Sequence, residues 1–223
     1  MINVGIVGCG YVGAAMKSWL EENNKEANVL VSDPPKGYND DLSEVDVAFV
    51  QINVPTEDDG TQDLTLMKNL IHKLPKVPVF VRTTILPGTS EKLSKDTGHD
   101  VYFMPEFLSE RTHIEDFKEQ TMVFTGALEL LKKVFPGKKF IVMSPLEAEL
   151  AKYIHNVFGA YKVTYFNAAK EYYKKFGNLD VANRYEATNG SAAKNNVRYT
   201  QFSVENIFKN TLLNTTTLTT PHA

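Results

Sequence analysis

Three glycines close to the N-terminus have a spacing that could hold phosphate groups against the backbone. Gly8, Gly10 and Gly13 form a G-x-G-x-x-G pattern between an apolar run of strand length and a helix-favouring segment. Gly8 permits a tight turn, Gly10 lets the backbone approach a pyrophosphate, and Gly13 lets a helix pack closely on a strand. The free N–H groups at the start of that helix, and its positive dipole end, would then bind the phosphates.

An acidic residue at the expected distance completes the pattern. Asp33 lies 20 residues after Gly13 and closes the second apolar run. Its carboxylate can accept hydrogen bonds from both ribose hydroxyls of NAD, and it would repel the 2′-phosphate of NADP. Lys36 lies nearby and weakens this discrimination slightly. We therefore predict NAD as the cofactor. The residues of this first unit that are predicted to bind it are Gly8, Gly10, Tyr11, Val12, Gly13 and Asp33.

The elements that must position this loop alternate between strand and helix patterns. Such alternation is typical of an α/β fold with a mostly parallel sheet, and short apolar runs suit strands that are buried on both faces. We therefore predict a Rossmann-like, doubly wound sheet. The strands are expected at 2–7, 28–32, 46–52, 77–82, 101–104, 122–125 and 139–143, and the helices at 14–24, 64–74, 89–96 and 127–135.

The pattern changes after Pro145. Residues 146–176 contain no proline, and their apolar residues recur at helical spacing, which predicts a long amphipathic helix. A small helical region is expected to follow it. We therefore divide the chain into an NAD-binding domain at 1–144, a central helical or dimerisation region at 145–213, and a disordered tail at 214–223.

Composition excludes several classes of protein. The chain has 223 residues, a net charge of −3 and one cysteine, so it cannot form an internal disulfide or a four-cysteine metal site. The five histidines have no close ligand spacing, and we predict no metal. The absence of a basic run argues against nucleic acid, and no apolar stretch is long enough to span a membrane. Because the sequence begins directly with a strand pattern, we expect a cytoplasmic protein.

Several further segments carry a family resemblance. The sequence is similar to the UDP-glucose/GDP-mannose dehydrogenase family, whose members oxidise a nucleotide sugar to a uronic acid with two NAD. The matches occur in the family's order and span about residues 1–187. They are Gly8–Gly13, Asn53–Thr56, Arg82–Thr89, Met104–Arg111 with Glu115–Phe117, and Glu147–Asn156.

The resemblance implies two further groups of residues at the cofactor. Val54, Pro55 and Thr56 would flank the ribose and pyrophosphate of NAD. Thr83 and Thr84 would lie near the nicotinamide ribose. The threonine that corresponds to Thr84 also helps to hold a water molecule at the reacting carbon in the family.

The resemblance also places two carboxylates and two backbone segments at the active site. Glu106 and Glu110 correspond to active-site acids, one of which assists water in the hydrolytic step. Phe107 and Leu108 would give backbone contacts to the sugar nucleotide. Judged by their sequence alone, the two acids could equally be first-turn charges that favour the dipole of a helix beginning near Pro105.

Two polar residues on the long helix complete the implied site. Lys152 and Asn156 correspond to residues that bind substrate and stabilise oxyanionic intermediates in the family. They are four residues apart, so they project from the same helix face, and an ammonium beside an amide donor can stabilise an alkoxide. A solvated helix lysine is the alternative for Lys152.

The sequence also departs from the family pattern. The family has a glycine-rich loop with a catalytic cysteine and a second nucleotide-binding domain, whereas the single cysteine here, Cys9, lies in the phosphate loop. We therefore expect a truncated nucleotide-sugar dehydrogenase, which is a homodimer through 146–176 or is completed by a partner chain. The alternatives are a two-electron hydroxyacid-type dehydrogenase, a non-catalytic NAD-binding module, and a structural or dimerisation protein.

Overall fold

The central element is a six-stranded sheet. The computed structural model describes residues 1–176. The strands are β1 (Ile2–Val7), β2 (Ala27–Asp33), β3 (Tyr38–Asn39), β4 (Val47–Val50), β5 (Val79–Val81), β6 (Val101–Phe103), β7 (Met122–Phe124) and β8 (Phe140–Val142). The helices are α1 (Tyr11–Asn23), η1 (Pro34–Lys36), α2 (Thr65–Lys73), α3 (Thr89–Thr97), α4 (His113–Glu119), α5 (Leu128–Val134) and α6 (Pro145–Phe176).

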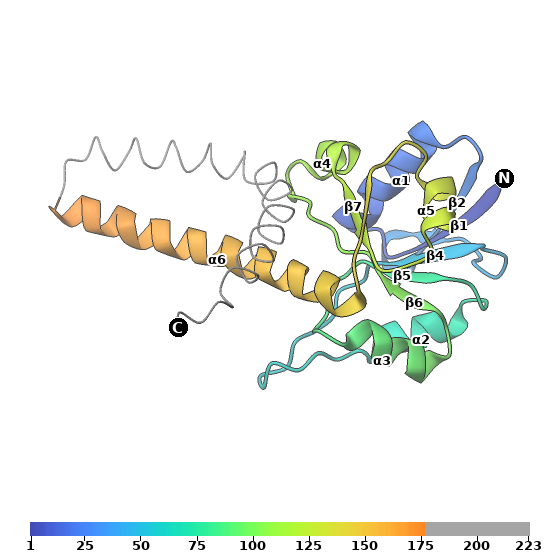
Figure 1. Cartoon of the computed structure of the whole chain (residues 1–223), viewed down its shortest axis with the longest axis horizontal. Coiled ribbons are helices and arrows are strands. Elements are labelled where there is room, and N and C mark those ends of the chain that lie inside the picture. Colours follow the sequence, from blue (N-terminus) through green and yellow to red (C-terminus); the bar gives the residue numbers. More distant parts are fainter. Residues whose placement is uncertain (177–223) are drawn as a thin grey trace, which may run out of the picture. The chain divides into compact units, whose positions relative to one another are not determined.

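The strand order is β3-β2-β1-β4-β5-β6, with β7 and β8 forming a separate parallel pair. Every pair in the large sheet is parallel except β2 with β3. Helices α1, α4 and α5 cover one face of this sheet, and α2 and α3 cover the other (Figure 1). The chain reverses its direction of strand addition between β1 and β4, which is where ligands bind in such sheets. The predicted Rossmann-like fold class is therefore confirmed.

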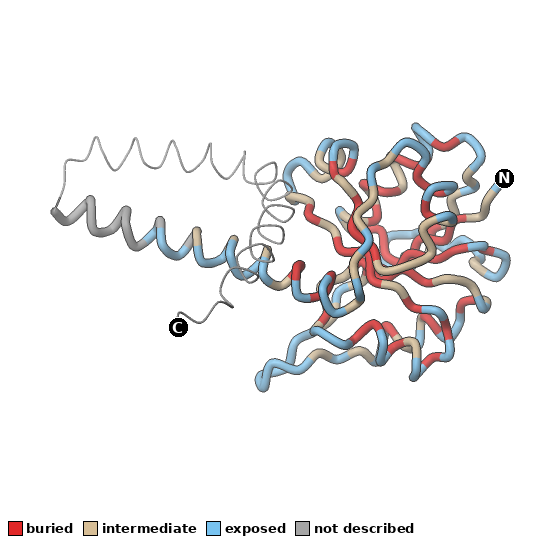
Figure 2. The backbone as a smooth tube through the Cα atoms, viewed as in Figure 1, coloured by how far each residue is buried: buried red, intermediate tan, exposed pale blue. Residues whose placement is uncertain are grey.

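Burial on both faces explains why the strands are short apolar runs. In β4, Val47 and Phe49 belong to the core beneath α1, α4 and α5, while Ala48 and Val50 belong to the core beneath α2 and α3. All four side chains are fully buried, and Figure 2 shows that buried residues are concentrated in the central strands. A strand between two helical layers has no polar face, so it reads as continuous hydrophobic sequence.

Three elements were not predicted. Helix α4 has only two apolar residues, Ile114 and Phe117, and it forms because Phe117 is buried in the core against Trp19. Strand β3 has two exposed residues and pairs at the edge with the end of β2. The short η1 helix between them begins at Pro34. None of these has a periodic signal of its own, and tertiary packing or edge pairing stabilises them.

The predicted long helix is confirmed as α6. The chain divides into two compact units, Met1–Tyr153 and Ile154–Ala223, with the boundary inside this helix. The predicted domain limits at 144 and 213 stay predictions. The small helical region and the tail at 214–223 lie outside the described residues.

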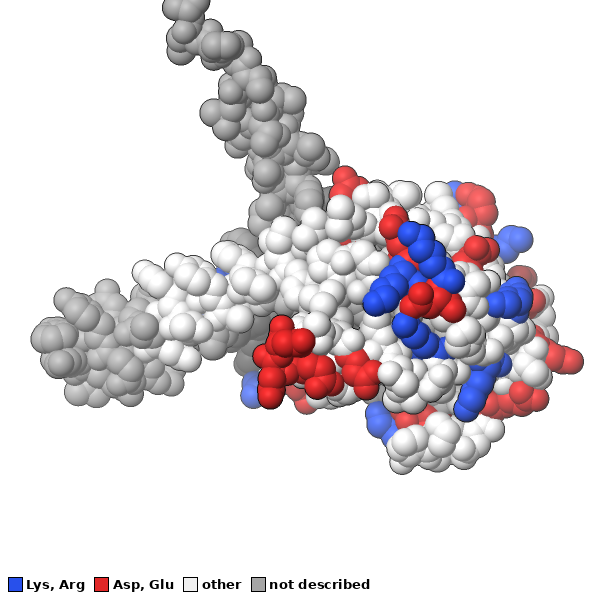
Figure 3. Space-filling model, turned by 90° about the horizontal axis from the view of Figure 1, so that it is seen from below, with Lys and Arg blue, Asp and Glu red and all other residues white. Residues whose placement is uncertain are grey.

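The charges of the described surface are mixed in sign. Acidic and basic side chains are interspersed on the face of the first unit that Figure 3 shows, which agrees with the small net charge of −3. Within residues 1–176, no helix combines the length and the hydrophobicity that are needed to cross a membrane. The same residues contain no group of three or more His, Cys, Asp or Glu side chains that could hold a metal ion.

Candidate active site

The three loop glycines differ in how much space a side chain would have if one were added at each position. Gly8 has a φ of +89°, and a Cβ atom there would lie 2.7 Å from the carbonyl oxygen of Gln51. A Cβ atom on Gly13 would lie 2.2 Å from the carbonyl oxygen of Gly8. At Gly10 the nearest atom would be Lys36 Nζ, at 3.7 Å. Gly8 and Gly13 are thus required by the turn and by close packing, whereas Gly10 leaves its backbone open to a ligand.

Asp33 is tied to the same loop. Its Oδ2 atom accepts a hydrogen bond of 2.7 Å from the backbone N–H of Cys9 and lies 3.6 Å from Lys36 Nζ. Lys36 also donates to the carbonyl oxygen of Cys9. Burial is the main cause that raises the pKa of the Cys9 thiol, so this cysteine stays protonated near neutral pH. The end of β2 therefore holds an acid against the backbone of the glycine loop, and its role in binding a ribose stays a prediction.

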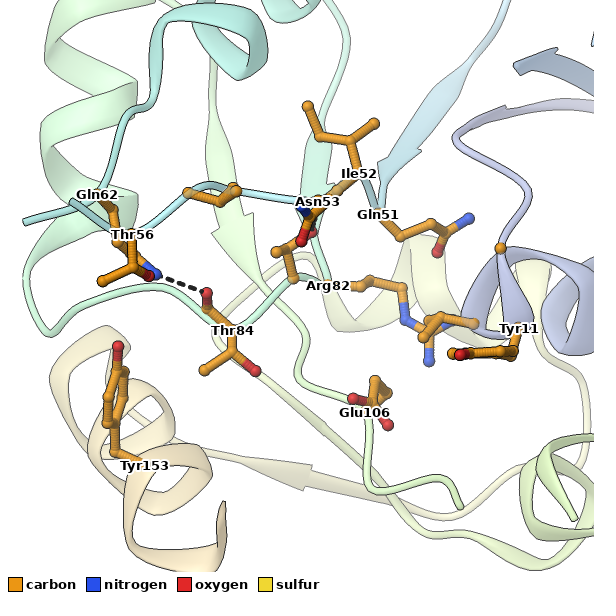
Figure 4. A pocket seen from close by; sticks show the side chains of 14 residues that line it. Tyr11, Gln51, Ile52, Asn53, Thr56, Gln62, Arg82, Thr84, Glu106 and Tyr153 are labelled. Carbon is orange, nitrogen blue, oxygen red and sulfur yellow. Dashed lines mark hydrogen bonds between the residues drawn. The ribbon is translucent and has the colours of Figure 1, made fainter. Parts of the chain in front are cut away.

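A cavity of about 510 Å³ opens at the carboxyl ends of the central strands. It lies beside the start of α1, the segments after β4, β5 and β6, and the third turn of α6 (Figure 4). Its lining residues are Gly10, Tyr11, Val12, Gln51, Ile52, Asn53, Val54, Thr56, Gln62, Arg82, Thr83, Thr84, Glu106 and Tyr153. Its position is that of the ligand crevice in doubly wound sheets.

The cavity brings together many of the residues predicted from the sequence. The predicted site residues that line it are Gly10, Tyr11, Val12, Val54, Thr56, Thr83, Thr84 and Glu106. Lining residues without a predicted role are Gln51, Ile52, Asn53, Gln62, Arg82 and Tyr153. Gln51 and Arg82 could have been found from their positions, because each directly follows a buried parallel strand, and Arg82 also begins one of the matched family segments.

Hydrogen bonds fix the two segments that follow β4 and β5. Thr83 Oγ1 donates to the carbonyl oxygen of Ile52 at 2.7 Å. The amide of Gln62 donates to the carbonyl oxygen of Thr84 at 3.2 Å, and its oxygen accepts from the N–H of Leu86 at 2.9 Å (Figure 4). The Thr83 hydroxyl thus joins the two segments at the cavity wall.

The strongest electrostatic feature beside the cavity is a buried ion pair. Lys152 Nζ lies 2.8 Å from Glu106 Oε1, and the two side chains are only 5% and 17% exposed. Glu106 Oε2 accepts a 2.6 Å hydrogen bond from the N–H of Leu108. Burial opposes ionisation of Glu106, but Lys152, Leu108 and Arg82 outweigh it, so the pKa of Glu106 lies below its ordinary value. The site therefore holds a carboxylate beside an ammonium.

A second carboxylate fixes the helix that carries Lys152. Glu149 is fully buried and accepts hydrogen bonds from the N–H of Gly88, the N–H of Ser90 and the hydroxyl of Ser90. It therefore caps the start of α3 and joins the second turn of α6 to the loop after β5. Lys152 follows three residues later on the same helix, so this anchor also holds the turn next to the one that carries its ammonium.

The remaining predicted residues lie apart from the cavity lining. A hydrogen bond to Glu110 raises the pKa of the Tyr11 hydroxyl, so this acid contacts the start of α1. Phe107 is buried, and its ring lies 5.3 Å from Lys152 Nζ. Asn156 belongs to the second unit. The roles of these residues in substrate binding and catalysis stay predictions.

The glycine loop, the acid at the end of β2 and the crevice between β1 and β4 together define a dinucleotide-binding α/β domain. Residues 34–134 match the model of the UDP-glucose/GDP-mannose dehydrogenase family, NAD binding domain. The N-terminal part of the chain is thus similar to this nucleotide-sugar dehydrogenase family, and the matched domain indicates NAD as the cofactor. The resemblance stated from the motifs is therefore confirmed.

Two curated relatives show the extent of the similarity. UDP-glucose 6-dehydrogenase of Rickettsia felis is 26% identical over 160 residues, which cover 63% of this chain and 36% of the relative. UDP-glucose 6-dehydrogenase AglM of Haloferax volcanii is 29% identical over 169 residues, which cover 62% and 39%. The chain thus spans little more than a third of the length of these relatives.

Solved structures support the fold. A UDP-glucose dehydrogenase from the archaeon Pyrobaculum islandicum superposes with a TM-score of 0.65 at 23% identity, covering 76% of this chain and 52% of that one. A GDP-mannose dehydrogenase from Pseudomonas aeruginosa, solved as a ternary complex, superposes with a TM-score of 0.59 at 22% identity, covering 74% and 51%.

Proposed function

We propose that this chain carries the NAD-binding and hydride-transfer part of a nucleotide-sugar 6-dehydrogenase of the UDP-glucose dehydrogenase type. The observation that carries the proposal is the buried Glu106–Lys152 pair, with Glu106 in the wall of the cavity next to the phosphate loop. A nucleotide sugar is the proposed substrate, with its alcohol carbon directed at this pair. NAD, when bound, supplies the acceptor for the hydride.

The chain's own residues supply the remaining chemistry of a two-electron step. Alcohol and NAD⁺ become aldehyde, NADH and a proton. Glu106 is held as a carboxylate, so it can accept the hydroxyl proton, and the Lys152 ammonium can stabilise the alkoxide that forms. Thr84, whose carbonyl oxygen is held by Gln62, is the proposed site for a water molecule at the reacting carbon.

The second oxidation, from aldehyde to acid, has no thiol at this site. The single cysteine of the sequence, Cys9, is buried in the phosphate loop, where its raised pKa keeps it protonated. A thiol route through a covalent intermediate is therefore not supported by the residues of this chain. We expect this chain by itself to release no more than one NADH per sugar.

An NADH-release assay tests the proposal. The purified chain is incubated with NAD and, in turn, UDP-glucose, UDP-N-acetyl sugars, GDP-mannose and small hydroxyacids. We expect turnover with a nucleotide sugar, and a loss of about 100-fold or more in Lys152→Met with NAD affinity kept. The matched control is Lys68→Met, which removes the partly exposed ion pair between Lys68 and Asp96 and should retain full activity.

The other outcomes of the same assay decide between the alternatives. Turnover of a hydroxyacid alone would identify a two-electron hydroxyacid-type dehydrogenase. NAD binding without turnover of any alcohol would identify a non-catalytic NAD-binding module, and two NADH per sugar would refute the two-electron limit. A homodimer through residues 146–176, a partner chain that completes the site, and a cytoplasmic location stay predictions for sedimentation, co-purification and cell fractionation.

A further inference from the structure

Arg82 is a buried cation with an incomplete set of partners. It directly follows β5, and its side chain is only 1% exposed. Its Nη1 atom lies 3.5 Å from the sulfur of Met16, and the guanidinium carbon lies 5.3 Å from the centre of the Phe117 ring. Its Nε and Nη2 atoms have no hydrogen-bond partner among the described residues. Buried arginines normally form ion pairs or hydrogen bonds, so we expect these two nitrogen atoms to have a hydrogen-bond acceptor in some state of the protein.

The identity of the two atoms limits what that acceptor can be. Nε and Nη2 lie on one edge of the guanidinium and direct two parallel N–H bonds the same way. This edge matches the two oxygens of one carboxylate. Met16 contacts Nη1, which is not part of that edge. The geometry therefore favours a carboxylate whose two oxygens accept from Nε and Nη2 of Arg82.

Burial points to a carboxylate of the protein itself. Both nitrogen atoms are closed to solvent, so a ligand from solution could not reach them without displacing the groups around them. Glu106 lines the same cavity, and in Figure 4 the Arg82 side chain extends past Gln51 toward Tyr11 and Glu106. The Arg82 charge is one of the causes that lower the pKa of Glu106. Within residues 1–176, Glu106 is the acid whose charge acts on Arg82.

Two lysines lie close to Glu106 and Arg82. Lys152 faces Glu106 from α6, and Lys138 is close enough to Arg82 for the guanidinium charge to lower its pKa, after burial as the main cause. Glu106 is therefore one carboxylate between two cations, and it is bound to only one of them, Lys152.

We propose that Arg82 is a positioning residue that takes over the Glu106 carboxylate when Lys152 turns to the substrate. The proposal rests on the proposed function, because it assigns the Lys152 ammonium to the oxyanion of the substrate. Lys152 cannot serve that oxyanion fully while it is bound to Glu106. The free edge of Arg82 lets the carboxylate exchange one cation for the other, so that the Glu106 charge keeps a partner until it accepts the hydroxyl proton.

The exchange can be tested without substrate by removing Lys152. The full chain is labelled with ¹³C at the glutamate carboxyls, the Glu106 signal is assigned from Glu106→Gln, and its pKa is measured by NMR. In Lys152→Met we expect the pKa of Glu106 to stay within about one pH unit of wild type, because Arg82 replaces the lysine. Adding Arg82→Met should then raise it by about two pH units. Lys68→Met is again the control, with no change at Glu106.

A second signal reports the contact itself. The ¹⁵Nε–H resonance of Arg82 should move downfield in Lys152→Met, as it does when a guanidinium binds a carboxylate, and should return in Lys152→Met/Glu106→Gln. If Arg82→Met does not fold, Arg82→Lys keeps a charge without the two-nitrogen edge, and it should still raise the pKa of Glu106 by about one pH unit in the Lys152→Met background.

Two results would overturn the proposal. One is a pKa of Glu106 in Lys152→Met that is already as high as in the double variant. The other is an unchanged Arg82 resonance, which would mean that the guanidinium acts only through space. Both measurements use protein without NAD or sugar, so they test the Arg82 proposal independently of turnover. A failure to form NADH would instead refute the proposed function alone.

Discussion

Replacing Glu149 by alanine tests how the site is held in position. Its carboxylate accepts hydrogen bonds from the N–H and the hydroxyl of Ser90, at 2.9 and 2.7 Å, and from the N–H of Gly88. Ser90 is 1% exposed and Glu149 is fully buried. Glu149→Ala would therefore leave two buried donors at Ser90 without a partner.

The magnitude follows from those two donors. A hydrogen bond to a charged group contributes about 1.5 kcal/mol or more, so the two at Ser90 give a loss of about 3 kcal/mol. Gly88 is exposed and its N–H can return to water, so it adds little. With a urea m-value of about 2 kcal/mol/M, the unfolding midpoint should fall by about 1.5 M.

Urea unfolding followed by tryptophan fluorescence is a suitable assay, because the single tryptophan, Trp19, is buried in the core of the first unit. The matched control is Glu147→Ala, in the first turn of α6. Glu147 accepts hydrogen bonds from the N–H and hydroxyl of Ser144, but both residues are exposed, and the loss should be about 1 kcal/mol or less. Equal losses in the two variants, or a loss below about 1 kcal/mol in Glu149→Ala, would refute the reasoning from burial.

Three further results are expected. Gly13→Ala should abolish NAD binding and lower stability, because its Cβ atom would lie 2.2 Å from the Gly8 carbonyl oxygen, as calorimetry and thermal unfolding can show. Asp33→Ala should weaken NAD binding by about 10-fold or more and reduce the preference for NAD over NADP, measured by titration with both. The pKa of Glu106 lies below its ordinary 4.5, so its contribution to stability is complete above that pH and is lost as pH falls through the folded-state pKa. Acid unfolding of Glu106→Gln should therefore depend less on pH than that of wild type.

Much of the fold could be predicted because its signals are local. Strand β1 is predicted with its observed bounds, and β2, β4 and α6 are found within a few residues of theirs, since apolar runs and helical spacing reflect burial directly. Helix α4 could not be predicted in this way. Its sequence is mostly polar, and a single buried side chain, Phe117, fixes it against helices that lie far away in the chain.

The residues of the candidate site also differ in whether local sequence could predict them. The glycine loop and Asp33 are recognisable from the sequence because their spacing within one βα unit is itself the requirement for binding a dinucleotide. The family motifs pointed to Glu106 and Lys152, yet a pattern cannot show that two side chains 46 residues apart form a buried ion pair. That contact depends on α6 returning to the carboxyl edge of the sheet.

The sequence by itself determined the class of fold, the glycine loop and the family resemblance, because each depends on residue types at short, fixed spacings. Only the tertiary structure decided which charges meet. Lys152 meets Glu106, Glu149 caps α3, and Arg82 is buried with one edge unpartnered among the described residues. The physical reason is that the strength of a charge or hydrogen bond depends on its neighbours and on the exclusion of water, and both are properties of the packed chain.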